Sequence, residues 1–118
     1  TFSSRGLGDV YKRQGLYYIT FTCVAKETGN SRYIGAHIYV TSDDFTSQDD
    51  LTYGYNSIDN QSAVVWSSHT VSCIFDVTNT STHKCKFTVQ SGNDAYKIYC
   101  PSSNRIDTVA TFMRIGDT

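Results

Sequence analysis

Acidic side chains gather in one polar stretch of the sequence, from Ser42 to Asp50. Calcium prefers oxygen ligands, so Asp43, Asp44, Asp49 and Asp50 form a candidate calcium site. The stretch lacks the D-x-D-x-D-G spacing that is typical of calcium-binding loops. We therefore interpret it as a solvated loop, keep calcium as the alternative, and predict neither a bound metal nor a cofactor.

The histidines do not form a recognisable catalytic pattern. His37, His69 and His83 lie in strand or turn contexts, and none has a nucleophile signature beside it. Nucleophilic catalysis needs a Ser or Cys that a positioned His activates. A glycosidase needs two facing carboxylates, and Asp76 on a predicted strand would need Asp107 as its partner. The sequence favours a protein that is not an enzyme.

The four cysteines show no C-x-x-C spacing. Cys23, Cys73 and Cys85 fall in register with core-type Phe and Ile residues, and free cysteine behaves as a small buried hydrophobe. We interpret them as core residues. A Cys73–Cys85 disulfide is the alternative. A zinc site at His83 and Cys85 would lack a second pair of ligands.

These residues need elements to position them, and the clearest pattern lies between Val71 and Gln90. Apolar residues recur there at every second position, on both sides of the polar run Thr78–His83. A strand sends successive side chains to opposite faces, so each half offers one apolar face and one polar face. We predict a two-stranded antiparallel hairpin that lies on a core.

The remaining chain divides into short strands and turns. Gly15–Lys26 and Arg32–Thr41 alternate in the same way around the turn residues Gly29-Asn30, and we predict that they form a first hairpin. Further strands are expected at Leu51–Ile58, Ala95–Tyr99 and Thr108–Ile115, and Ser62–Val77 is expected to form either one long bent strand or two. Seven or eight short strands predict an all-β sandwich or barrel.

Length, composition and charge fit one small β domain. The chain has 118 residues and 14% aromatic residues, which include nine Tyr and six Phe. No apolar run reaches membrane-spanning length, so no membrane insertion is expected. The segment Ser4–Gln14 resembles a translated sequencing adapter, so we interpret residues 1–14 as a leader outside the domain and 15–118 as the domain. The domain then carries seven basic and ten acidic residues, which argues against a nucleic-acid partner.

Two segments are similar to strands of a known superfamily. Gly15-Leu-Tyr-Tyr-Ile-Thr-Phe21 resembles the G-x-Y-Y-F-x-F strand of C1q/TNF-like domains, and Tyr53-Gly-Tyr55 fits the middle of that fold. Thr111-Phe-Met-Arg-Ile-Gly-Asp117 resembles its last strand, especially in phage and marine viral structural proteins. Two departures stand out: the opening strand is missing, and Met113-Arg114 replaces the usual glycine and leucine-like pair.

The resemblance implies an antiparallel jelly-roll β-sandwich that assembles as a homotrimer. We expect the head of a virion or tail-fibre protein, located in the virion, that recognises a host-surface receptor or glycan. A secreted, extracellular C1q-like ligand and a carbohydrate-binding or carbohydrate-active jelly roll are the alternatives. Tyr-rich strand faces suit subunit contacts, so the expected trimer interface is Tyr18, Tyr53, Tyr55 and Phe112. The alternative is that an uneven two-sided sandwich simply buries these rings. The expected contact loops contain Asp43, Asp44, Phe45, Asp49, Asp50, Asn79, His83, Ser102 and Asn104.

Overall fold

The computed structural model describes residues 2–3, 13–27, 33–57, 65–92, 96–98 and 108–118, and within them the chain is all-β. Its strands are β1 (Phe2–Ser3), β2 (Gly15–Glu27), β3 (Tyr33–Thr41), β4 (Asp49–Ser57), β5 (Val65–Val77), β6 (Lys84–Ser91), β7 (Tyr96–Ile98) and β8 (Val109–Gly116). The prediction of an all-β protein is confirmed. No helix in these ranges is long and apolar enough to cross a membrane.

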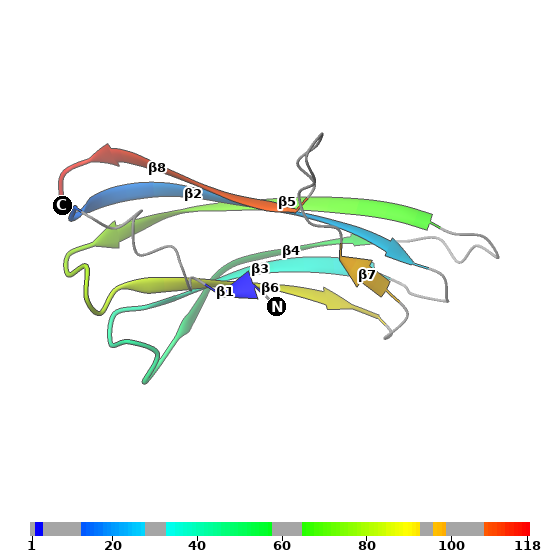
Figure 1. Ribbon diagram of the computed structural model, residues 1–118, viewed down its shortest axis with the longest axis horizontal. Helices are drawn as coiled ribbons and strands as arrows, with labels where there is room; N and C mark the ends of the chain where they lie inside the picture. The colour runs from blue at the N-terminus through cyan, green and yellow to red at the C-terminus, as the bar shows by residue number, and fades with distance from the viewer. Residues whose placement is uncertain (1, 4–12, 28–32, 58–64, 93–95, 99–107) are drawn as a thin grey trace.

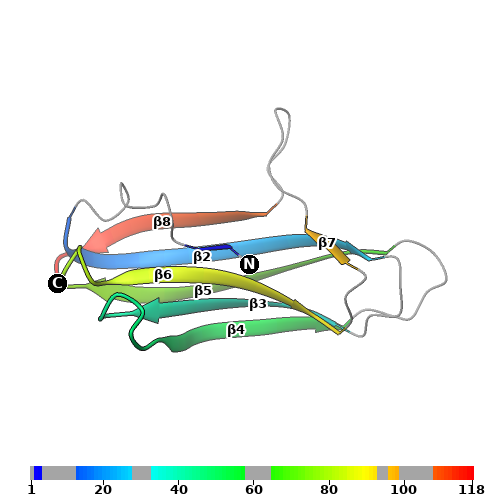
Figure 2. The same ribbon diagram turned by 60° about the horizontal axis from the view of Figure 1, so that its bottom comes forward.

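The strands form two stacked antiparallel sheets (Figure 1). The first sheet has the order β1-β6-β3-β4. In the second, β2 is central: β5 pairs along its whole length, while β8 and β7 pair with successive parts of its other edge. Figure 2 shows the same two layers from a second side. Each layer has three long strands and one short one, which is a sandwich-like arrangement.

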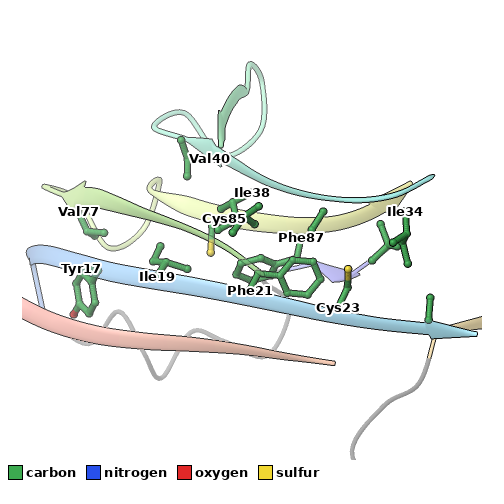
Figure 3. Close-up of a cluster of buried hydrophobic side chains, with 14 residues drawn as sticks. Tyr17, Ile19, Phe21, Cys23, Ile34, Ile38, Val40, Val77, Cys85 and Phe87 are labelled. Atoms are coloured by element: carbon green, nitrogen blue, oxygen red, sulfur yellow. The ribbon is translucent and has the colours of Figure 1, made fainter. Parts of the chain in front are cut away.

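The core lies between the two layers and is built by alternating residues of β2, β3, β5 and β6 (Figure 3). The Phe21 ring of β2 meets the Phe87 ring of β6 with centroids 5.0 Å apart, so the two sheets touch at the centre of the sandwich. Ile19, Ile34 and Ile38 are fully buried around them. Burial of these apolar side chains is the main force that holds the layers together.

Both predicted hairpins are wrong, although their strands are real. β5 pairs with β2, whereas β6 pairs with β3 and β1, so Val71–Gln90 spans both sheets. β2 and β3 are separated between the two layers in the same way. Alternation shows which face of a strand is apolar, but two strands can bury such faces side by side or across a core. Six residues, Thr78–His83, easily span the distance of about 10 Å between packed sheets.

The cysteines behave as core residues. Cys23 and Cys85 are buried, Cys73 is half-buried, and all three are free thiols. The alternative Cys73–Cys85 disulfide is therefore wrong. Burial raises the pKa of the Cys73 thiol to about 11, which keeps it in the unreactive protonated form. Cys100 lies outside the described residues.

The N-terminal segment contributes a short piece of backbone pairing. Phe2 and Ser3 pair antiparallel with Phe87 and Lys86 of β6. The assignment of residues 1–14 to a leader stays a prediction.

Edge strand β4 of the first sheet meets edge strand β5 of the second sheet at one side of the sandwich. Asn56 of β4 donates a side-chain hydrogen bond to the Ser68 carbonyl of β5. Beside it, a Cβ atom at Gly54 would lie 2.1 Å from Nε2 of His69. Gly54 is therefore needed to make room for the His69 imidazole between the sheets.

We predict that Phe21→Ala lowers the free energy of unfolding by about 3–5 kcal/mol, because it leaves a cavity at the contact with Phe87. Urea unfolding measures the change. Ile115→Ala is the matched control, since Ile115 is 48% exposed on β8 and lies outside any assigned contact. Equal losses for the two variants would contradict the assigned core.

Candidate functional site: an aromatic face on the first sheet

The outer face of β3, β4 and β6 carries the densest cluster of aromatic and polar side chains in the described chain. We call it the tyrosine face; it consists of Tyr33, His37, Tyr39, Asp50, Tyr53, Tyr55, Lys86 and Gln90. Apolar residues of the same strands, such as Ile38 and Phe87, point to the core. Strand alternation thus separates the core from this face.

A β-bulge in β4 brings Asp50 to the tyrosine face. The register shifts between Ile38 and Tyr39, so that Ile38 pairs with Thr52 while Tyr39 pairs with Asp50. Leu51 is the extra residue. If β4 alternated regularly through Leu51, Asp50 would share the inner face with Thr52 and Gly54. Bulges often redirect a side chain in this manner next to functional sites.

His37 lies at the centre of the tyrosine face and is only 7% exposed. Its Nδ1 lies 2.9 Å from Asp50 Oδ2. Its Nε2 lies 3.1 Å from the Tyr55 hydroxyl and 3.2 Å from Gln90 Oε1. The Tyr55 hydroxyl also donates to Gln90 Oε1 at 3.0 Å. Both ring nitrogens are therefore satisfied, and the network connects all three strands.

Ring contacts hold the surrounding tyrosines in place. The imidazole of His37 is stacked with Tyr39 and with Tyr53, each at a centroid distance of 5.6 Å. The Tyr55 ring makes edge contacts with Tyr33 at 5.3 Å and with Tyr53 at 5.8 Å. Such aromatic pairs stabilise one another beyond the area they bury. The tyrosine face is therefore preorganised.

Gly35 explains how the Tyr55 ring lies close to the sheet. A Cβ atom at Gly35 would lie 2.3 Å from two carbons of that ring. Only glycine lets the ring lie against the β3 backbone. Together with Ser57, Tyr33 and Tyr55 line an open depression of about 450 Å³ beside this contact.

Tyr55 remains a neutral hydrogen-bond donor. Desolvation by burial, followed by the nearby Tyr33 and Asp50, raises the pKa of its hydroxyl above the ordinary value of 10.0. A raised pKa makes the phenolate less accessible at neutral pH. The phenol is thus suited to binding through hydrogen bonds and is not activated as a nucleophile.

The loop between β3 and β4 is tied down by the buried Thr41 and by Asp43. Thr41 Oγ1 accepts hydrogen bonds from the backbone N–H groups of Asp43 and Phe45. The Asp43 carboxylate accepts hydrogen bonds from Thr41 Oγ1 and from the backbone N–H and the hydroxyl of Ser47. Asp44 and Phe45 adopt left-handed φ angles of 57° and 64°. A positive φ is uncommon for a bulky residue, and here the hydrogen bonds of the loop hold Phe45 in that conformation.

Phe45 and Tyr39 enclose a lysine at one end of the tyrosine face. The Lys86 ammonium lies 5.2 Å from the Tyr39 ring centroid and 5.4 Å from that of Phe45. It also donates to Gln48 Oε1 at 2.6 Å. This is a cation–π site completed by a carbonyl acceptor.

The structure does not bring the four candidate calcium ligands together. The Asp43 carboxylate is engaged within its loop, Asp44 pairs with Lys84, and Asp50 pairs with His37. Asp49 is exposed at the start of β4. Among the described residues, no group of three or more His, Cys, Asp or Glu side chains is placed to hold a metal.

Several other predicted site residues occupy a separate loop or lie outside the described ranges. In the β5–β6 connection, Asn79 Oδ1 accepts the Ser81 backbone N–H, and His83 stacks on Phe75 at 5.8 Å. The Asp44 backbone N–H donates to the Thr82 carbonyl, so this connection adjoins the Phe45 loop. Ser102, Asn104 and Asp107 lie outside the described residues, whereas Asp76 is exposed on β5.

The four residues expected at the trimer interface do not share one surface. Tyr53 and Tyr55 lie on the tyrosine face, 61% and 44% exposed. Tyr18 lies on the outer face of the second sheet. Phe112 packs against the core, with its ring centroid 5.8 Å from that of Phe87. Phe112 is therefore not an outward-facing aromatic residue.

Tyr18 belongs to a second exposed feature. It pairs with Ile74 of β5 on one side and Met113 of β8 on the other. These three side chains, 37%, 58% and 55% exposed, form a line across the second sheet that we call the apolar row. The tyrosine face and the apolar row lie on opposite outer faces of the sandwich.

Sequence reasoning missed His37, Lys86 and Gln90 as members of the site. They lie on three positions of β3 and β6, and only the cross-strand register places them around the same tyrosines. The alternation did mark all three positions as facing away from the core. The alternation of apolar and polar residues could not predict that β3 pairs with β6.

No protein-family model matches this sequence, and no curated protein matches it. The site is therefore interpreted from its geometry. That geometry is a rigid aromatic face with neutral hydrogen-bonding tips and a buried imidazole, which suits binding.

The Asp43 hydrogen bonds lead to a prediction for its titration. Bonds from Ser47, then from Thr41, lower the pKa of Asp43 from 3.8 to about 2. Because this pKa is lower in the folded protein, the stabilisation that ionised Asp43 gives the folded state is fully present above pH 3.8. It is lost as the pH falls to about 2. We expect Ser47→Ala to raise this pKa toward 3.8, because the main donor is removed. Carboxyl-detected NMR titration measures it, and an unchanged midpoint would contradict the assigned bonds.

Proposed function

We propose that this domain is a non-enzymatic binding and structural module, the homotrimeric head of a virion or tail-fibre protein of the C1q/TNF-like jelly-roll type, which attaches to a host surface. The observation that carries the proposal is the tyrosine face. Its viral setting comes from the resemblance of Thr111–Asp117 to the last strand of viral structural proteins.

The tyrosine face has the properties of a recognition surface. Tyr53 and Tyr55 are large, exposed and already ordered by contacts with His37, so binding would cost them little conformational entropy. Tyrosine presents apolar area together with a polar tip, and it is enriched at the energetic centres of interfaces. The neighbouring loop adds Phe45 to the same surface.

The apolar row supports self-association. Ile74, Tyr18 and Met113 expose adjoining apolar surface without charged residues within the row. Exposed apolar patches of this kind mark contact sites in soluble proteins. Subunits that meet through this row would leave the tyrosine face of each copy accessible. Three copies on one axis would then convert weak single contacts into firm attachment.

We expect the double variant Ile74→Lys/Met113→Lys to abolish trimer formation, because two buried charges at each contact cannot be desolvated. Sedimentation equilibrium of the purified protein measures the mass. The wild type should have three times the mass of one chain, and the variant should have the mass of a single chain. Circular dichroism confirms that the fold is kept.

The matched control is Tyr53→Ser, which alters the opposite face and should leave the trimer intact while reducing attachment. Attachment is measured on a glycan array and on whole cells. A wild-type monomer would contradict the proposed assembly. If Tyr53→Ser converted the trimer to monomers, the tyrosine face would be the subunit contact. That result would refute the proposal that one face assembles the copies and the other binds the partner.

A further inference from the structure

We infer that the tyrosine face receives a cationic side chain, Lys or Arg, from a basic segment of a protein partner, at a position defined by Tyr53, Tyr55 and Asp50. The inference rests on the proposed binding function and specifies the chemistry of the partner.

The molecule itself shows the kind of group that this surface accommodates. Lys86 places its ammonium over Tyr39 and Phe45 at 5.2 and 5.4 Å, with Gln48 Oε1 as its hydrogen-bond acceptor. Electron-rich ring faces attract cations, and a carbonyl oxygen completes the site. One end of the tyrosine face is thus already occupied by a cation of the same chain.

The other end of the tyrosine face offers comparable rings without such a cation. No Lys or Arg of the described residues lies over the rings of Tyr53 or Tyr55, which are 61% and 44% exposed. Their rings make an edge contact, with centroids 5.8 Å apart and an interplanar angle of 63°. Two rings set at an angle can contact a cation from two sides.

Asp50 lies in the cross-strand row of Tyr39 and Lys86, next to the row of His37 and Tyr53, and it supplies the acceptor that a cation requires. Its Oδ2 is bonded to His37, whereas its Oδ1 accepts no hydrogen bond from the described residues. The side chain is 32% exposed, so a partner can reach it. A guanidinium or ammonium group at this point would combine a ring contact with a charge-assisted hydrogen bond.

The charge around the tyrosine face is complementary to a cation. The tyrosine face, together with the adjoining β3–β4 loop and the start of β4, carries the four carboxylates of Asp43, Asp44, Asp49 and Asp50 against the two lysines Lys84 and Lys86. Lys84 is already paired with Asp44. The surface therefore carries a net charge of about −2, which steers basic partners toward it and repels acidic ones. This balance favours a basic protein segment over an acidic glycan.

The test is a fluorescence titration of the full chain with an N-acetylated hexa-arginine peptide and with its isosteric neutral counterpart, hexa-citrulline. We expect the arginine peptide to bind at 50 mM salt and to weaken as salt rises, and the citrulline peptide to bind at least tenfold more weakly. Equal binding of the two peptides would overturn the inference.

Variants locate the binding position. Tyr53→Leu, which removes the ring, should weaken arginine-peptide binding about threefold to tenfold, while Tyr53→Phe should retain it. Lys86→Gln should strengthen binding, because it removes the competing positive charge. Thr70→Ala is the control and should change nothing, because Thr70 is exposed on the outer face of β5 and lies outside the apolar row. Thermal unfolding confirms that each variant is folded.

Two results would overturn the assigned position: undiminished binding by Tyr53→Leu, or an equal loss upon Thr70→Ala. Failure of this inference differs from failure of the proposed function. If Tyr53→Ser abolishes attachment to cells but the arginine peptide does not bind, the tyrosine face is a recognition surface for another chemistry. If neither effect is seen, the proposed function itself fails.

Discussion

The hydrogen bond between His37 and Asp50 is the interaction on which the tyrosine face depends. An imidazole that is almost fully covered on the outer side of a sheet needs partners for both nitrogens, because an unsatisfied buried polar group is costly. The bulge at Leu51 supplies the first partner by turning Asp50 outward. Tyr55 and Gln90 satisfy the second nitrogen. With the imidazole fixed, the tyrosines that stack on it are fixed as well.

The two glycines of this region serve the same arrangement. Gly35 allows the Tyr55 ring to lie on the β3 backbone, and Gly54 leaves room on the inner side of β4 for His69. The Tyr53-Gly-Tyr55 sequence thus has a physical reason. Its tyrosines point outward to the face, and its glycine faces inward where edge strands β4 and β5 meet. One short strand thereby closes the sandwich and presents the site.

The two outer faces of the sandwich differ in chemistry, and each suits a different part of the proposed function. The second sheet exposes the apolar Ile74, Tyr18 and Met113, whereas the first exposes aromatic rings with polar tips and a negative balance of charge. Apolar surface suits permanent contacts between copies, and a polar aromatic surface suits a partner that binds and leaves. A sandwich keeps these two faces apart because its core lies between them.

Much of the fold could be predicted from the sequence, and the part that failed has a definite cause. Alternation located the long strands and the core positions of Phe21, Cys23, Cys85 and Phe87, because the period of two follows from strand geometry. It could not show that β5 and β6 lie in different sheets, since both arrangements bury the same apolar faces. The hairpin predictions failed for that reason.

The candidate site was predictable only in pieces. Tyr53 and Tyr55 were recognised as outward aromatic residues, and Phe45 as a loop residue. Their joining with His37, Asp50 and Lys86 depends on the β3–β4 and β3–β6 registers and on a bulge, and no local pattern encodes these. Phe112 was assigned to an interface although its ring completes the core beside Phe87. Aromatic residues suit both environments, so residue type alone did not separate them.

In the proposed assembly, the apolar row is buried between the copies and the tyrosine face is exposed. Hydroxyl-radical footprinting of the native assembly, read by mass spectrometry at Tyr18, Met113, Tyr53 and Tyr55, tests it most directly. We expect Tyr18 and Met113 to be protected in the assembly and to become reactive upon dissociation, while Tyr53 and Tyr55 are reactive in both states. Protection of Tyr53 and Tyr55 in the assembly, with Tyr18 and Met113 reactive, would contradict it.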